Sequence, residues 1–170
     1  AMNLLNRGYE VIVFNRSVEK MEELTQFGAK TAASPAELAQ SVDVLFTMLS
    51  DDAALMNVYY GKDGVMEGHH VGLTVIDCST VSPQTSIKIH DDLFSHIVNF
   101  LDAPFSGSTP AAVNATLVFM VGGEKEVFDA QQPLLRKLGS KAVYMGPSGS
   151  GSTTKLAHNT IVGINMAGFA

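Results

Sequence analysis

Lys155 and Asn159 are the residues of this sequence whose types and spacing best suit acid–base chemistry. They follow Gly149-Ser150-Gly151 and stand four residues apart, so on a helix both side chains leave the same face, with ~5–6 Å between their Cβ atoms. A lysine acts as a general acid or base when burial or a nearby cation lowers its pKa toward neutrality. Taken alone, such a pair is more often solvated at the surface. Its chemistry therefore depends on what surrounds the helix.

Other polar segments come directly after expected strands. They are Asn15-Arg16-Ser17, Leu49-Ser50, Cys78-Ser79-Thr80 and Pro104 to Ser108. In open α/β sheets, ligands bind outside the carboxyl ends of the strands. The hydroxyl and backbone N–H groups of Ser106-Gly107 could bind a carboxylate, or this segment could be only a tight turn.

The elements that must position these residues alternate between strand and helix. Gly8 ends a first helix, and Ser34-Pro35 and Ser82-Pro83 have the cap-then-proline pattern of helix starts. The expected strands include 10–14, 42–49, 73–77, 116–121 and 141–145, and the expected helices include 18–27, 124–138 and one from near Ser152 to Ala170. The continuous apolar run at 42–49 indicates a strand buried on both faces. This alternation predicts an α/β fold with a Rossmann-like, doubly wound, mainly parallel sheet.

Composition restricts the partners that the chain can bind. A formal charge of −6 and only 11 Lys and Arg argue against binding to nucleic acid or an anionic membrane. No apolar stretch approaches the ~20 residues of a membrane span. The single cysteine, Cys78, follows a buried strand and is interpreted as a core residue, and no metal site is expected. These features favour a cytoplasmic protein that binds a small molecule or another protein.

Four motifs, in order, resemble those of the β-hydroxyacid dehydrogenases. They are Val-Phe-Asn-Arg-Ser at 13–17, Asp-Cys-Ser-Thr at 77–80 with Pro83, Asp-Ala-Pro-Phe-Ser-Gly at 102–107, and Gly-Ser-Gly at 149–151 followed by Lys155 and Asn159. The set spans almost the whole chain and is similar to the 3-hydroxyisobutyrate dehydrogenase-like branch, whose relatives include 6-phosphogluconate dehydrogenase. The resemblance implies hydride transfer between NADP(H) or NAD(H) and a small β-hydroxy acid or the matching semialdehyde acid.

The resemblance also implies roles for the residues of the site. Lys155 exchanges the proton of the substrate hydroxyl or carbonyl oxygen, and Asn159 orients that oxygen. Ser106 and Gly107 bind the acid group, and Ser79 lies beside the substrate. Leu49, Ser50 and Thr80 contact the cofactor, although capping of helices is an equal alternative for the loop residues. Gly163, two turns after Lys155, leaves room for a bound group, whereas Leu156, Ile161 and Ile164 supply core packing.

Five residues bear on the choice of cofactor and substrate. Asn15, Arg16 and Ser17 include no acid that would hold a ribose 2′-hydroxyl, so NADP is preferred over NAD, although Arg16 could be only a solvated turn residue. Ser108 replaces a glycine that usually continues the family's Ser-Gly pattern. His158 before Asn159 is similar to 6-phosphogluconate dehydrogenase, which is the alternative within this class; packing is the plainer role of this histidine.

The resemblance predicts an NAD(P)-binding domain at 1–147 and the start of an interdomain helix at 148–170. The family's first strand and G-x-G-x-x-G turn are expected before Ala1, and an all-helical domain that forms homo-oligomers is expected after Ala170. The 170 residues alone are then inactive. A dinucleotide-binding domain kept as a scaffold without turnover is the alternative from another class.

Overall fold

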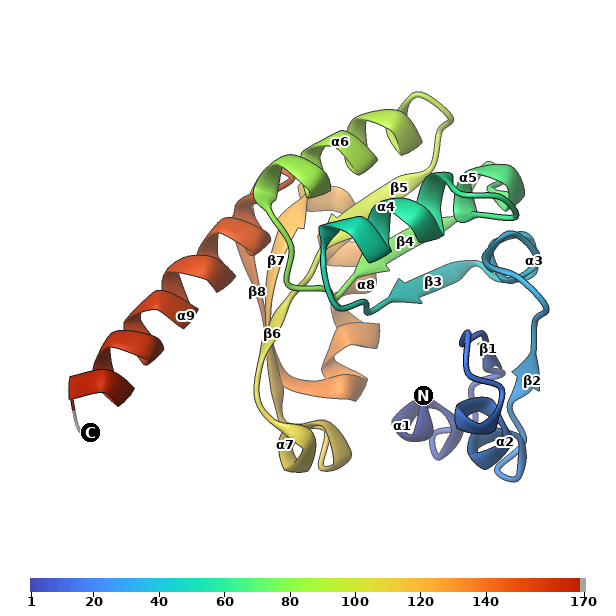
Figure 1. Ribbon diagram of the computed structural model, residues 1–170, viewed down its shortest axis with the longest axis horizontal. Coiled ribbons are helices and arrows are strands. Elements are labelled where there is room, and N and C mark those ends of the chain that lie inside the picture. The colour runs from blue at the N-terminus through green and yellow to red at the C-terminus, as the bar shows by residue number, and fades with distance from the viewer. Residues whose placement is uncertain (169–170) are drawn as a thin grey trace.

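The computed structural model describes residues 1–168 as an α/β fold (Figure 1). Its helices are α1 (Met2–Leu5), α2 (Glu19–Thr25), α3 (Pro35–Gln40), α4 (Asp52–Tyr60), α5 (Val65–Gly68), α6 (Pro83–Phe94), α7 (Thr109–Val113), α8 (Lys125–Leu138) and α9 (Ser150–Gly168). Its strands are β1 (Ile12–Val13), β2 (Lys30–Thr31), β3 (Val44–Thr47), β4 (Thr74–Asp77), β5 (Asn99–Asp102), β6 (Phe105–Ser106), β7 (Leu117–Gly123) and β8 (Gly139–Gly146). The predicted alternation of strands and helices is confirmed.

The main sheet has six strands in the order β3-β4-β5-β7-β6, with β8 beside β7. The pairs β3-β4, β4-β5 and β7-β8 are parallel, whereas β7 is antiparallel to β5 and β6, so a mainly parallel, Rossmann-like sheet is confirmed. β6 lies where the sequence indicated only a turn, because Phe105 and Ser106 pair with β7. The register of β4 and β5 places Asp77 beside Asp102 at the carboxyl edge.

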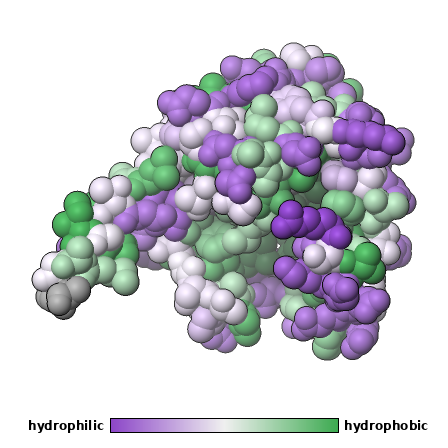
Figure 2. Space-filling model, viewed as in Figure 1, coloured by the Kyte–Doolittle hydropathy of each residue, from purple (hydrophilic) through white to green (hydrophobic). Residues whose placement is uncertain are grey.

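β1 and β2 form a separate parallel pair, and an apolar hollow of about 700 Å³ lies between β1 and β3. Figure 2 shows this hollow near the centre of the molecule, with a green, apolar wall. Consecutive residues of both segments, 9–14 and 41–48, border it, so the edges of the two strands face it. Val44 and Phe46 are only half-buried, and the prediction of a strand buried on both faces is therefore wrong for β3.

Two apolar clusters cover the two faces of the main sheet. Tyr59 of α4 and Ile89 of α6 pack in one cluster with Val75 of β4. Phe128 and Leu135 of α8 pack in the other cluster with Ile76, the next residue of β4. Because neighbouring residues of a strand point to opposite faces, β4 contributes to both clusters, and all four of its residues are buried.

The cap-then-proline helix starts are confirmed. The Ser34 hydroxyl accepts a hydrogen bond from the Glu37 N–H (3.1 Å), and the Glu37 carboxylate accepts one from the Ala33 N–H (2.7 Å). The Ser82 hydroxyl caps α6 in the same way, with Pro83 in the first turn. Across residues 1–168, no helix has both the length and the apolar character that a membrane span requires.

Helix α9 begins at Ser150, two residues before the expected start, and projects from the body of the molecule (Figure 1). Gly151 and Ser152 in its first turn are buried, but Leu156, Ile161 and Ile164 are 39%, 60% and 66% exposed. The prediction that these three residues supply core packing is therefore wrong for this chain, because only the first turns of α9 contact the sheet. Nothing lies within 4 Å of a Cβ placed on Gly163, which agrees with the expected room at this position. The predicted continuation of the helix to Ala170 lies partly outside the described residues.

Candidate functional site

The structure brings the Ser106 segment and α9 together, although they are distant in sequence. The Ser106 hydroxyl lies 3.5 Å from Nε2 of His158, which is half-buried on α9. Gly107 has a φ of +136°, and a Cβ at this position would lie 2.8 Å from the Leu117 side chain. Glycine is therefore required here, and the residue is exposed next to the half-buried Ser106.

Lys155 is half-buried on the same side of α9, one turn before His158 and Asn159. Within residues 1–168, its ammonium has no hydrogen bond or ion pair, and desolvation lowers its pKa. This is the direction that acid–base chemistry near neutral pH requires. Asn159 is exposed, and its side-chain oxygen lies 3.4 Å from Nδ1 of His158. The three polar side chains form one accessible group on the helix.

A buried carboxylate that the sequence analysis left without a role connects α9 to the sheet. Asp102, at the end of β5, accepts hydrogen bonds from the N–H groups of Gly149 and Ser152, both at 2.8 Å. Burial raises the pKa of Asp102, and these two hydrogen bonds oppose that shift. Asp102 belongs to the quoted motif at 102–107, but no local pattern links it to partners 47 and 50 residues away.

Asp77, at the end of β4, makes a second buried network. One carboxylate oxygen, Oδ1, accepts hydrogen bonds from the hydroxyls of Thr47 (2.7 Å) and Ser79 (2.6 Å), while Oδ2 has no partner among the described residues. Burial raises the pKa of Asp77. The Ser79 hydroxyl also accepts a hydrogen bond from the Leu49 N–H (2.9 Å), and Ser79 is 1% exposed. This hydroxyl thus joins two loops and does not face solvent, whereas Thr80 is exposed.

The remaining predicted cofactor residues lie at or near the surface. The Ser50 hydroxyl donates to Asp51 (2.7 Å), whose carboxylate caps α4 at Ala54, so Ser50 supports a cap without forming it. Asn15 accepts a hydrogen bond from the Ser17 N–H (2.9 Å) in a turn directly after β1. Arg16 in that turn is exposed. Its guanidinium is therefore accessible to a bound anion.

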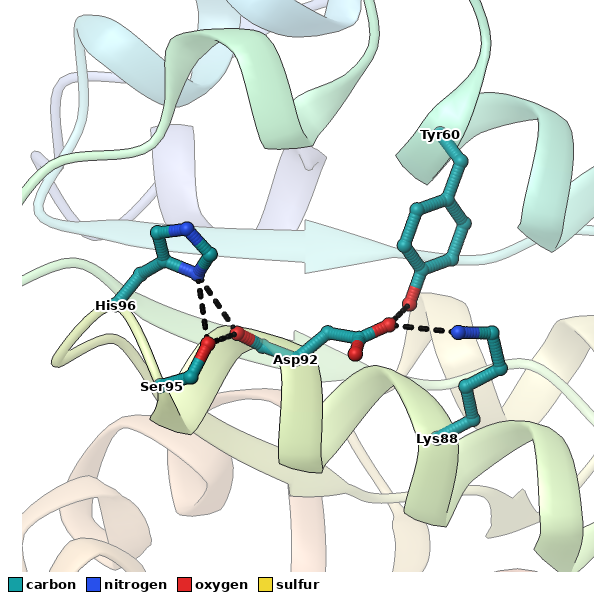
Figure 3. Close-up of polar contacts among 5 residues, drawn as sticks. All are labelled: Tyr60, Lys88, Asp92, Ser95 and His96. Carbon is teal, nitrogen blue, oxygen red and sulfur yellow. Dashed lines mark hydrogen bonds and ion pairs between the residues drawn. The ribbon is translucent and has the colours of Figure 1, made fainter.

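Another polar cluster, here called the Asp92 cluster, joins α4 to α6 (Figure 3). Asp92 accepts hydrogen bonds from Tyr60 (2.5 Å) and Lys88 (2.8 Å), and its main-chain oxygen contacts Ser95 and His96. The hydrogen bond from Lys88 is the largest cause of the lowered pKa of Asp92, and burial, with Asp92, raises the pKa of Tyr60. The cluster links two helices outside the predicted site.

The described residues contain no group of three or more His, Cys, Asp or Glu side chains that could hold a metal ion. Cys78 is 8% exposed and packs in the core, which confirms its interpretation as a core residue. Burial raises the pKa of the Cys78 thiol well above its usual range, so the thiol stays protonated.

Sequence comparisons match the chain to dehydrogenases. Residues 1–146 match the family model described as the NAD binding domain of 6-phosphogluconate dehydrogenase. The chain is 38% identical over 166 residues to "Probable 3-hydroxyisobutyrate dehydrogenase, mitochondrial" of Dictyostelium discoideum, covering 98% of this chain and 52% of that protein. It is 36% identical over 170 residues to glyoxylate/succinic semialdehyde reductase 1 of Arabidopsis thaliana, covering all of this chain and 59% of that protein. The chain thus spans little more than half the length of these relatives.

Two solved structures share this fold over nearly the whole chain. Psf3 in complex with NADP+ and 2-OPP superposes with a TM-score of 0.93 at 29% identity, over 98% of this chain and 59% of that one. The Mycobacterium tuberculosis 3-hydroxyisobutyrate dehydrogenase solved with L-serine gives a TM-score of 0.88 at 29% identity, over 94% of this chain and 54% of that one.

Proposed function

Because this chain belongs to the β-hydroxyacid dehydrogenase family, we propose that the full-length protein transfers hydride between NADP(H) or NAD(H) and a small β-hydroxy acid or its semialdehyde. One observation carries this proposal. The half-buried Lys155, with its lowered pKa, lies on α9 one turn from His158, which contacts the Ser106 hydroxyl. This arrangement supports a site in which a proton-transfer group lies near an anion-binding turn.

In this proposal, Lys155 gives a proton to the carbonyl oxygen during reduction and removes it from the hydroxyl during oxidation. Asn159, one turn further along α9, orients the same oxygen. The Ser106 hydroxyl and the Gly107 N–H bind the carboxylate of the substrate. The nicotinamide, when bound, supplies or accepts the hydride. Ser79 supports this site indirectly, since its buried hydroxyl fixes the main chain of Leu49.

The exposed strand ends fit a dinucleotide cofactor. Leu49 and Ser50 follow β3 and Thr80 follows β4, and both strands end at the same edge because they are parallel. In this proposal these residues hold the nicotinamide end. Asn15, Arg16 and Ser17 hold the adenosine ribose and favour NADP, since no carboxylate competes for a 2′-phosphate in that turn.

The hollow between β1 and β3 supports a proposal about the cofactor's phosphates. The carbonyls of Val11 and Val13 accept hydrogen bonds from the N–H groups of Lys30 and Ala32. Those of Asp43 and Thr47 accept hydrogen bonds from the N–H groups of Thr74 and Cys78. By the alternation of a parallel strand, the intervening main-chain groups point into the hollow. The family's opening strand would fit there and carry its glycine-rich phosphate turn. We also propose that residues 147 and 148 mark the boundary between an NAD(P)-binding domain and an interdomain helix. We further propose that a helical domain follows this helix and forms homo-oligomers, and that the protein is cytoplasmic.

Turnover by the full-length protein tests the function. The assay supplies NADPH or NADH with succinate, methylmalonate or tartronate semialdehyde and follows oxidation of the cofactor. Lys155→Ala should lower kcat by about 10²- to 10⁴-fold with little change in cofactor affinity. Unchanged turnover in this variant would exclude Lys155 as the proton-transfer residue. The His158-Asn159 pair is similar to 6-phosphogluconate dehydrogenase, so 6-phosphogluconate with NADP+ belongs in the panel as the alternative substrate.

A further inference from the structure

We propose that Asp102 is a positioning residue that holds helix α9 against the sheet and thereby sets the position of Lys155 relative to the Ser106 turn. Its importance for turnover rests on the proposed function. Its action on α9 does not, and can be measured without substrate. Asp102 is completely buried at the carboxyl end of β5. It belongs to no part of the site that contacts cofactor or substrate in the proposal above.

The carboxylate of Asp102 serves as a long-range cap for α9. The first N–H groups of a helix lack partners within the helix, and a negative charge near them is favourable. Oδ1 accepts the hydrogen bond from Gly149 N–H and Oδ2 accepts that from Ser152 N–H, each at 2.8 Å. Hydrogen bonds to an ionised acceptor are stronger than neutral ones. Both oxygens are therefore used to fix one helix end.

Two glycines allow this helix end to lie directly on the strands. A Cβ on Gly122 of β7 would lie 2.5 Å from Oδ1 of Asp102. A Cβ on Gly151 would lie 2.5 Å from the main-chain oxygens of Asp102 and Met120. Neither position has space for a larger side chain unless α9 moves. The Asp102 carboxylate is thus enclosed by the main chain of β7 and by the first turn of α9.

Both sides of the proposed site, Lys155 and the Ser106 turn, are connected to the buried Asp102. Lys155 is three residues after Ser152, within one helical turn, and Ser106 is four residues after Asp102. Ser106 is fixed in turn by the pairing of β6 with β7. A second contact braces the helix, because the hydroxyls of Ser152 and Ser86 lie 2.9 Å apart. Loss of the Asp102 contacts should therefore move Lys155 while leaving the Ser106 turn in place.

Asp77 provides a matched comparison. It is the Cα partner of Asp102 on the neighbouring strand and is equally buried, at 1% against 0% exposed. Its carboxylate contacts Thr47 and Ser79, and it has no hydrogen bond to α9 among the described residues. If removal of a buried charge acts only by lowering overall stability, Asp102→Asn and Asp77→Asn should have the same effect on α9. If Asp102 holds the start of α9, only Asp102→Asn should change it.

The decisive experiment measures amide hydrogen exchange in the full-length protein for wild type, Asp102→Asn and Asp77→Asn, under conditions where circular dichroism shows all three folded. The Asp102→Asn side chain keeps one acceptor and loses the other, so the Gly149 and Ser152 amides should exchange about 10- to 100-fold faster, as expected for loss of one hydrogen bond to a charged group. The Leu49 amide should change only in Asp77→Asn. Unchanged exchange at Gly149 and Ser152 in Asp102→Asn would overturn the proposal.

A second measurement links the helix to Lys155. The rate of reductive methylation of the Lys155 amine at several pH values reports its pKa, and this pKa should differ from that of wild type in Asp102→Asn but not in Asp77→Asn. If wild type turns over a semialdehyde, Asp102→Asn should lower kcat while the Kd for NADPH stays unchanged. An inactive wild type would count against the proposed function only, whereas identical Lys155 titration in all three proteins would count against the role of Asp102.

Discussion

The two sides of the candidate site are held in different ways. At the ends of β4 and β5, the buried carboxylates of Asp77 and Asp102 use hydrogen bonds to fix the neighbouring loops and α9. At the end of β1, Asn15, Arg16 and Ser17 form a turn at the surface beside an open hollow. The proposed chemical side is therefore fixed by the protein interior, while the side proposed for the adenosine ribose consists of groups at the surface.

The largest effect on stability should come from adding a side chain where the first turn of α9 packs directly on the sheet. Gly151→Ala places a methyl group 2.5 Å from main-chain oxygens that cannot rotate away, so it should destabilise the fold by about 1–3 kcal/mol. Gly163→Ala is the control on the same helix, where nothing lies within 4 Å. It should stabilise the protein by up to ~1 kcal/mol, because alanine favours helix over glycine. Urea unfolding measures both, and equal effects would show that the first turn is not tightly packed.

The next prediction concerns pH and the buried acids. Because the pKa of Asp77 is raised by burial, its favourable contribution is complete below about pH 4 and is lost as the pH rises through the raised value. Asp77→Asn removes this titration. The free energy of unfolding of wild type relative to the variant should therefore fall over the pH range above about 4, the ordinary pKa of aspartate. A difference that does not vary over this range would contradict the raised pKa.

Substitution of Arg16, on the exposed side of the candidate site, should change cofactor binding and not the stability of the fold. Arg16→Ala should weaken NADPH binding by about tenfold or more, because a charged hydrogen bond to the 2′-phosphate is lost. NADH binding and the unfolding midpoint should change little, since Arg16 is exposed. Fluorescence titration of the full-length protein with both cofactors measures this. An equal loss for both cofactors would exclude Arg16 as the residue that favours NADP.

The smallest effect is expected at the Asp92 cluster. Lys88 and Asp92 are 54% and 37% exposed in their side chains, and exposed pairs contribute about 0.2–1 kcal/mol. Because the pKa of Asp92 is lowered, its contribution is present above the ordinary pKa of aspartate and is lost as the pH falls through the lowered value. The loss of unfolding free energy caused by Asp92→Asn should thus be smallest at acidic pH. This pH trend is opposite to that expected for Asp77→Asn. Parallel trends in urea unfolding would disprove this contrast.

Local patterns were sufficient to predict the helix starts at Ser34 and Ser82 and the order of strands and helices. That Lys155 and Ser106 belong to one site is a prediction of the family resemblance and not of a local pattern. They could not predict the roles of Asp77 and Asp102, because the partners of these acids come from other strands and helices. The partial exposure of β3 was not predicted for a related reason. An apolar run shows that a strand can be buried on both faces, whereas the neighbouring elements decide how much of the strand is buried. For the same reason, apolar residues of α9 are exposed where no element of the described chain covers them.

The hollow between β1 and β3 has a practical consequence for work with residues 1–170 as an isolated polypeptide. Among residues 1–168, β1 pairs only with β2 and β3 only with β4, so a free edge of each strand borders an apolar surface. Such edges are templates for pairing with another molecule. Strand pairing between molecules increases with concentration and with the hydrophobicity of the edge. Aggregation in concentrated samples of this polypeptide should therefore begin at residues 11–14 and 43–48, and charged substitutions at these edges should slow it.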